Sequence, residues 1–146
     1  MSGNRPDVSE LVIVEDGELV FRFVQPGHIN TAAPIGARLQ TSALQSNEFT
    51  PNEHSYGPSV YVRSRLTNGV ADLHEACSKW RAWQLAEIPV GTVLALGVTV
   101  RLSPQDCEFP TIRHAHATLI GVTKAIRDQL IRVIEANLLP ATKPTE

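Results

Sequence analysis

The amino-acid sequence predicts an α+β fold: a single domain with a mostly antiparallel sheet, two helices packed on it and one long loop. Runs rich in β-branched residues come in neighbouring pairs that no helix separates, which is typical of antiparallel strands. The chain has 146 residues, 42% of them hydrophobic and 19% charged, which is the size and composition of one globular domain. We expect that domain to span residues 9–139, with flexible ends at 1–8 and 140–146.

The domain begins with a predicted β-hairpin and a long loop. Residues 11–14 and 18–24 are two β-rich runs around the dipeptide Asp16-Gly17, which is preferred in tight hairpin turns. Residues 25–58 then show neither helical nor strand periodicity and are rich in Pro, Gly, Ser, Thr and Asn. A segment of this length without regular elements is uncommon inside a compact domain and is typical of a functional loop or a lid.

Hydrophobic periodicity predicts the remaining elements. Residues 59–64 alternate in polarity and predict a half-buried strand, whereas residues 69–86 repeat apolar side chains at helical spacing. Residues 90–102 form a long apolar run, which predicts a central strand covered on both faces. A further strand is expected over residues 114–121, and a closing helix after Thr123, a good capping residue. The expected inner faces of the two helices are Val70, Leu73, Cys77, Trp80 and Gln84, and Ile126, Leu130, Val133, Ile134 and Leu138.

Charge and composition exclude several classes of function. The formal net charge is −2, which provides no basic surface for nucleic acid, so we expect no DNA or RNA partner. No apolar run approaches the roughly 18–20 residues that cross a bilayer, and residues 1–6 lack the layout of a signal peptide. We therefore expect a cytoplasmic protein without membrane contact. Cys77 and Cys107 stand in no metal or disulfide pattern, and we expect no cofactor; acids beside Cys107 would raise its thiol pKa.

The most chemically suggestive motif is RHAHATLIG, residues 113–121. If this segment is a strand, His114, His116 and Thr118 share one face, and the two imidazoles are about 7 Å apart. Two histidines in that arrangement can hold one metal ion when a third ligand comes from elsewhere, which makes His114 and His116 a weaker, alternative metal pair. The other interpretation is that His114 is exposed in a loop and His116 forms a hydrogen bond where the strand begins.

The same motif has the form H-x-T-apolar at His116, and this resembles half of the motif of the two-histidine phosphoesterases. In that family one histidine is the general acid, another is the general base, and nearby hydroxyl groups bind the phosphate. The resemblance implies a catalytic role for His116. The mechanism also needs a second copy of H-x-[ST], which this sequence does not contain.

The long loop contains a second set of candidate residues. Arg38 stands near the hydroxyl residues Thr41 and Ser42, with His28 upstream, and an arginine beside hydroxyl groups is a common combination for binding phosphate or carboxylate. We therefore assign these four residues as candidate ligand-binding residues.

Two arginines within predicted strands are also candidates. Arg22 and Arg63 lie in β-rich runs, where charged residues are less expected. Ion pairing with an acid is the commoner explanation, and projection of both side chains into a shared cleft is the alternative.

Short motifs along the chain resemble a family of small bacterial proteins. FRFVQPGHI, RLQTSAL, PSVYVRS and HAHATLIG are similar to that family's R-x-[IV]-x-P opening, Ser-rich loop, S-V-Y strand and A-H-A-apolar-G strand. The resemblance covers residues 21–138 and implies that Arg38, Ser42, His116 and Gly121 occupy the pattern positions. It implies no activity, but it favours His116 acting with the Arg38–Ser42 loop, as a small-ligand or nucleotide-like site or as a structural latch.

We therefore expect a small binding or accessory module, non-enzymatic or of unproven activity, that acts through a protein partner or a small ligand at the loop of residues 28–57. The alternative is a hydrolase or transferase acting on a phosphate-containing substrate. In that alternative His116 is the acid or base and Arg38 binds the anion.

Overall fold

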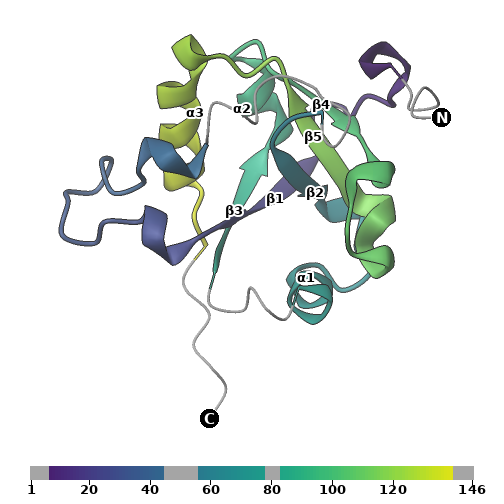
Figure 1. Ribbon diagram of the computed structural model, residues 1–146, viewed down its shortest axis with the longest axis horizontal. Coiled ribbons are helices and arrows are strands. Elements are labelled where there is room, and N and C mark those ends of the chain that lie inside the picture. Colours follow the sequence, from purple (N-terminus) through teal and green to yellow (C-terminus); the bar gives the residue numbers. More distant parts are fainter. Residues whose placement is uncertain (1–6, 45–55, 78–82, 140–146) are drawn as a thin grey trace.

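A five-stranded antiparallel sheet forms the centre of the fold in the computed structural model, which describes residues 7–44, 56–77 and 83–139 (Figure 1). The strand order is β3-β1-β2-β5-β4, and every neighbouring pair is antiparallel. The strands are β1 (Leu19–Val24), β2 (Ser59–Val62), β3 (Gln84–Pro89), β4 (Thr99–Leu102) and β5 (His116–Ile120). The predicted α+β class with a mostly antiparallel sheet is confirmed.

Helices cover both faces of this sheet. On one face, α2 (Val90–Leu94) and α3 (Lys124–Ala136) pack with residues 39–44 on an aliphatic cluster. On the opposite face, α1 (Val70–Ala76) packs beside the 3₁₀ helix Pro110–Ala115 on a cluster rich in aromatic and sulfur-containing side chains. Figure 1 shows α3 and α1 on opposite sides of the strands. None of the helices in the described part of the chain is both long and apolar enough to span a bilayer.

The predicted hairpin of residues 11–14 and 18–24 is wrong, because residues 11–14 lie beside β4. Val14 donates its N–H to the carbonyl oxygen of Val100, and Leu102 donates to that of Val12, both at 2.8 Å. Both edges of β1 are occupied by β2 and β3, so no edge remains for residues 11–14. The turn residue Gly17 does adopt the expected positive φ, 99°.

The predicted helix over residues 69–86 ends much earlier, at Ala76. Residues 84–89 form β3 instead and pair along their whole length with β1. Leu73 and Cys77 are buried, as their helical spacing predicted, but Gln84 begins a strand. Trp80 lies outside the described residues. The range predicted as one helix therefore contains the helix α1 and the first residues of the strand β3.

The apolar run of residues 90–102 is also two elements rather than one central strand. Its first part is α2, the chain turns at Gly97 with a φ of 86°, and β4 follows. β4 is at the end of the sheet, with residues 12–14 along its outer side. In the next predicted strand, 114–121, the first two residues belong to the 3₁₀ helix and β5 begins at His116.

The closing helix and the long loop are connected by side chains of α3. Thr123 caps α3 as predicted, because its Oγ1 accepts the N–H of Ile126 at 3.3 Å. Leu130, Ile131 and Ile134 are buried against the sheet. Glu135 accepts the N–H of Leu39 at 2.9 Å, so the described part of the loop is held on this helix. Residues 45–55 of the predicted loop lie outside the described residues.

Candidate functional site

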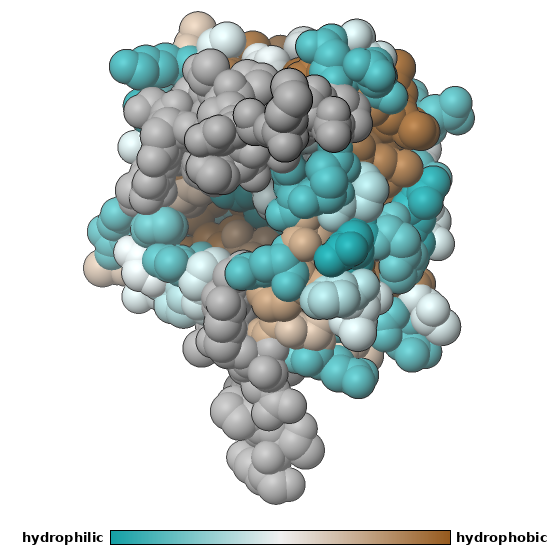
Figure 2. Space-filling model, turned by 45° about the vertical axis from the view of Figure 1, so that its right-hand side comes forward, coloured by the Kyte–Doolittle hydropathy of each residue, from teal (hydrophilic) through white to brown (hydrophobic). Residues whose placement is uncertain are grey.

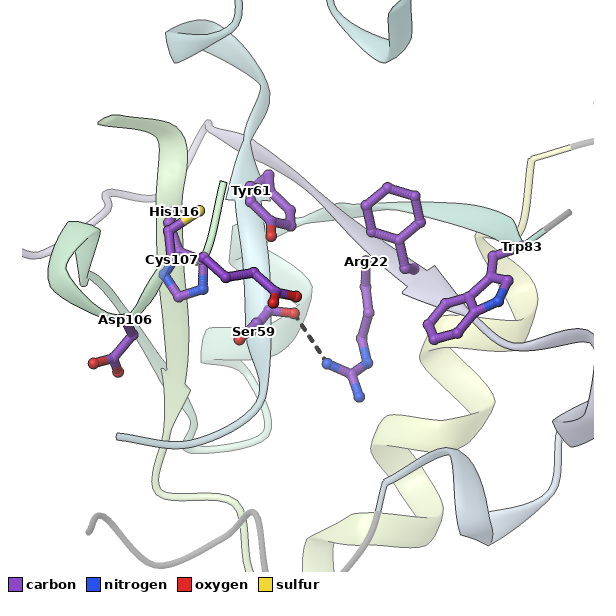
Figure 3. A pocket seen from close by; sticks show the side chains of 9 residues that line it. Arg22, Ser59, Tyr61, Trp83, Asp106, Cys107 and His116 are labelled. Carbon is purple, nitrogen blue, oxygen red and sulfur yellow. Dashed lines mark hydrogen bonds between the residues drawn. The ribbon is translucent and has the colours of Figure 1, made fainter. Parts of the chain in front are cut away.

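A pocket of about 390 Å³ lies where the ends of β1, β2 and β5 meet the segment before the 3₁₀ helix Pro110–Ala115 (Figure 3). Figure 2 brings this side of the molecule forward and shows a hollow with apolar side chains at its base and hydrophilic ones along its lower rim. The pocket is lined by Arg22, Phe23, Ser59, Tyr61, Trp83, Asp106, Cys107, Glu108 and His116.

Hydrogen bonds fix the orientation of the buried imidazole of His116. The residue is 2% exposed, and its Nδ1 lies 2.8 Å from the backbone carbonyl oxygen of Ser103. A carbonyl oxygen can only accept, so Nδ1 carries the proton and donates it to Ser103. Nε2 is then the nitrogen with the lone pair, and no described residue forms a hydrogen bond to it. His116 therefore offers the pocket a fixed hydrogen-bond acceptor.

A buried hydroxyl pair supports this arrangement. The Ser103 Oγ lies 3.0 Å from His116 Nδ1 and 2.6 Å from the Oγ1 of Thr118. Ser103 and Thr118 are fully buried. From His116 onward the side chains alternate between the two faces, as expected for a strand, and Ala117 belongs to the aliphatic cluster on the opposite face. The hydroxyl groups satisfy each other in the protein interior and keep the imidazole in place.

Burial also sets the charge of His116. It lowers the pKa of the imidazole below its ordinary value of 6.5, and the Ser103 carbonyl and Asp106 oppose the shift without reversing it. His116 is accordingly neutral at pH 7. A neutral imidazole with its Nδ1 proton bound to a carbonyl can accept a hydrogen bond or a proton at Nε2.

Tyr61 and Cys107 form the wall next to His116. The Tyr61 ring meets the imidazole edge-to-face, with ring centroids 5.4 Å apart. Burial raises the pKa of the Cys107 thiol. The hydrogen bond from the Phe109 N–H lowers this pKa but does not reverse the shift, and the nearby charge of Glu108 raises the pKa further. The predicted direction of this shift is confirmed, but its main cause is burial. A thiol with a raised pKa is a poor nucleophile, so Cys107 forms part of the wall and is not an activated group.

Arg22 lies at the other end of the pocket, beside Trp83 (Figure 3). Its Nη1 donates to the carbonyl oxygen of Ser59 at 3.0 Å, and its Nη2 donates to that of Ala43 at 3.1 Å. These contacts fix the guanidinium at the pocket wall. Phe23 and Trp83 lie next to it as apolar surface, with ring centroids 6.4 Å apart. A planar cation beside aromatic rings can bind a carboxylate or phosphate group.

The two arginines predicted within strands have different roles. Arg63 forms an exposed ion pair with Glu87 at 3.1 Å, so the common explanation holds for it. Arg22 lines the pocket but Arg63 does not, so the two side chains do not share a cleft. An arginine inside a β-rich run was therefore the sequence signal for one end of this pocket.

The structure does not bring Arg38 to the pocket that His116 lines. Arg38 donates from Nε to the carbonyl oxygen of Ala33 at 2.8 Å, within the loop that α3 holds. His116 lies on the opposite face of the sheet, with Arg22 as the arginine in its pocket. The other predicted loop residues belong to short 3₁₀ helices: His28 to Pro26–His28, and Thr41 and Ser42 to Thr41–Ala43.

The two histidines of the opening motif are separated by the local fold. His114 is exposed in the 3₁₀ helix Pro110–Ala115, whereas His116 is buried in β5. The shared strand face that would place both imidazoles on one metal ion is therefore not formed. Among the described residues no cluster of three or more His, Cys, Asp or Glu side chains could hold a metal ion.

Comparisons with models of protein families, with curated proteins and with solved structures found no match. The functional argument therefore depends on the geometry of the chain itself.

Proposed function

We propose that this domain binds a small polar ligand in the pocket between His116 and Arg22. The observation that carries the proposal is the fixed tautomer of His116, whose Nδ1 donates to the Ser103 carbonyl and whose Nε2 lies at the wall of the pocket. An acceptor with this orientation favours an N–H or O–H donor on the ligand, because a ligand that displaces water from the acceptor without replacing its hydrogen bond loses affinity.

The rest of the lining narrows the class of ligand. Arg22 supplies guanidinium N–H donors at one end, where an acidic group of the ligand would lie, and the carboxylates of Asp106 and Glu108 in the same lining would accept from donors of the ligand. Phe23, Tyr61 and Trp83 supply aromatic surface between the two ends. A small planar or compact acid that also carries an N–H or O–H donor fits these three features. The site thus differs from the loop of residues 28–57, and the occupant is a small molecule in place of a protein.

The first test is a ligand screen observed at His116 itself. Protein with ¹⁵N-labelled histidine is titrated with a panel of free amino acids and nucleoside monophosphates, which are abundant acids of the cytoplasm, where we expect the protein to act. We expect one class of compound to shift the His116 Nε2 resonance, because a new donor contact changes the shielding of that nitrogen.

A matched pair of variants decides whether the site is the one proposed. His116→Asn keeps a donor where Nδ1 was and removes Nε2, and it should weaken binding about tenfold, the effect of losing one hydrogen bond. His74→Asn makes the same change at a histidine of α1 that lines neither this pocket nor any other pocket described here, and it should leave the affinity unchanged. Equal affinity of the His116→Asn variant, or no His116 response to any compound, would contradict the proposal.

Catalysis is the second candidate, because a neutral, oriented imidazole is also the form that acts as a general base. In this version Arg22 replaces Arg38 as the residue that binds a phosphate-containing substrate. The test is ³¹P NMR of phosphate monoesters incubated with the protein. Turnover by the wild type that the His116→Asn variant lacks would establish catalysis, and binding without turnover would limit the site to recognition.

A further inference from the structure

A second, separate pocket is lined in part by the 3₁₀ helix Pro110–Ala115. Its volume is about 450 Å³, and it is formed by this helix, the 3₁₀ helix Arg63–Arg65 and the end of β4. The lining residues are Arg65, Leu102, Pro104, Pro110, Arg113 and His114. The motif that contains both histidines therefore contributes to two pockets, with His116 in the first and His114 in the second.

The polar side chains of this second pocket are all basic or neutral. Among the described residues that line it, none is acidic. Arg65, Arg113 and His114 are exposed, and in the described part of the chain none of their side chains forms an ion pair or a hydrogen bond. The concave surface thus carries two guanidinium groups, and no acid in the described segments forms an ion pair with either.

Other arginines of the chain contrast with these two. Arg63 pairs with Glu87, and Arg132 pairs with Glu135. Arg101 donates to the carbonyl oxygen of Leu11 at 3.0 Å. These arginines stabilise the fold, whereas Arg65 and Arg113 make no such contact and converge on one cavity.

We propose that this second pocket binds the phosphate group of a small organic phosphate monoester. A phosphate dianion has three terminal oxygen atoms, and two guanidinium groups with an imidazole supply enough donors to reach all of them, with bidentate contacts from each arginine. A carboxylate has only two oxygen atoms and one charge. Leu102, Pro104 and Pro110 form the apolar part of the pocket and would contact the organic group of the ligand.

This proposal is independent of the ligand proposed for the His116 pocket. None of the residues that line the second pocket lines the first, so the two sites can be occupied separately. The His116→Asn variant should consequently retain full binding in the second pocket, and failure of either proposal leaves the other standing.

The experiment is a calorimetric and NMR titration of the full chain with phenyl phosphate, inorganic phosphate and benzoate. Phenyl phosphate should bind most tightly, because it has both the dianion and an apolar group. Inorganic phosphate lacks the apolar group and benzoate lacks the second charge, so both should bind more weakly. The backbone amide signals of Arg65, Arg113 and His114 should shift during the phenyl phosphate titration.

Variants test the two arginines against a matched control. Arg65→Gln and Arg113→Gln should each weaken phenyl phosphate binding about tenfold, and the double variant about a hundredfold, the expected loss for one and two charge-assisted contacts. Arg63→Gln removes an exposed arginine two positions away that pairs with Glu87 and does not line the pocket. The Arg63→Gln variant loses the same single positive charge, and its affinity for phenyl phosphate should change less than twofold.

Three results would overturn the proposal. An equal loss in the Arg63→Gln variant would show that phosphate responds only to the general charge of this surface. Equal binding of benzoate and phenyl phosphate would contradict recognition of a dianion. Unchanged affinity in the double variant, with an amide spectrum that shows it is folded, would place any binding elsewhere.

Discussion

The two faces of the sheet differ in what they bury. Beneath α3, the cluster of buried residues consists only of Val, Leu, Ile and Ala. On the face of α1, the cluster contains Phe21, Tyr61, Cys77 and Cys107, and the polar His116 lies beside it. Burial of aliphatic side chains stabilises the fold without requiring a particular orientation of the contacts. A buried polar group, in contrast, destabilises the fold unless it forms a hydrogen bond, so its position and partner are fixed. The α3 face is therefore mainly a source of stability, whereas the α1 face carries His116 of the proposed ligand site, and Arg22 reaches that site from the α3 side of β1, where it donates to Ala43.

The largest expected effect comes from breaking the α3 face. Leu130 is fully buried in that cluster, and Leu130→Ala should lower the free energy of unfolding by about 2–5 kcal/mol, the usual cost of lost burial plus a cavity. The measurement is urea denaturation followed by far-UV circular dichroism. Because the sheet lies between Leu130 and the pocket, the His116 ring resonances should stay in place at low denaturant.

A second substitution on the same helix is the control for this effect. Val133 is only partly buried, so Val133→Ala removes less apolar area from the cluster and should cost clearly less than Leu130→Ala. Equal losses for the two variants, or a shift of the His116 resonances in Leu130→Ala, would contradict the division of roles between the faces.

A smaller effect is expected from the buried hydroxyl pair on the α1 face. Ser103→Ala leaves the Thr118 hydroxyl buried without its partner at 2.6 Å, which should lower the free energy of unfolding by about 1–3 kcal/mol. The backbone carbonyl still accepts from His116 Nδ1, so the tautomer should persist. The ¹⁵N shifts of His116 report the tautomer, and denaturation reports the stability.

The double variant distinguishes a hydrogen bond from simple packing. Thr118→Val together with Ser103→Ala removes both hydroxyl groups and leaves no unsatisfied partner in the pair. We expect the double variant to be more stable than Ser103→Ala alone, since replacing both partners of a buried hydrogen bond can be nearly neutral. Additive losses from the two substitutions would show that the hydroxyl groups do not interact.

The sequence predicts the sheet class and the closing helix because each depends on local signals. Alternation placed His116 and Thr118 opposite Ala117, and Thr123 marked the start of α3. Boundaries inside apolar segments could not be predicted in the same way. The run of residues 90–102 is buried in both of its elements, so its composition does not distinguish α2 from β4.

The errors with functional consequences came from long-range pairing. Residues 11–14 pair with β4, which follows them by more than eighty positions, and no local pattern encodes that choice. The candidate site was predicted at His116, and Arg22 was identified as unusual in its strand. Ser103 and Tyr61 were missed, because their proximity to His116 depends on the strand order and leaves no sequence signal.

The smallest expected effect, a dependence of stability on pH, sharpens the contrast between the faces, because among the described residues the aliphatic cluster contains no titratable group. Burial lowers the pKa of His116 below 6.5 in the folded protein. Below that pH the unfolded chain binds a proton that the folded chain does not, so the free energy of unfolding falls as the pH falls toward the folded pKa. One proton gives a slope of at most about 1.4 kcal/mol per pH unit.

Urea denaturation between pH 7.5 and 5.5 should show a steeper loss of the free energy of unfolding in the wild type than in His116→Asn. The other histidines are present in both proteins, so their contributions cancel in the difference. Equal slopes would mean that His116 titrates alike in the folded and unfolded chains, and would remove the argument that its imidazole is held neutral.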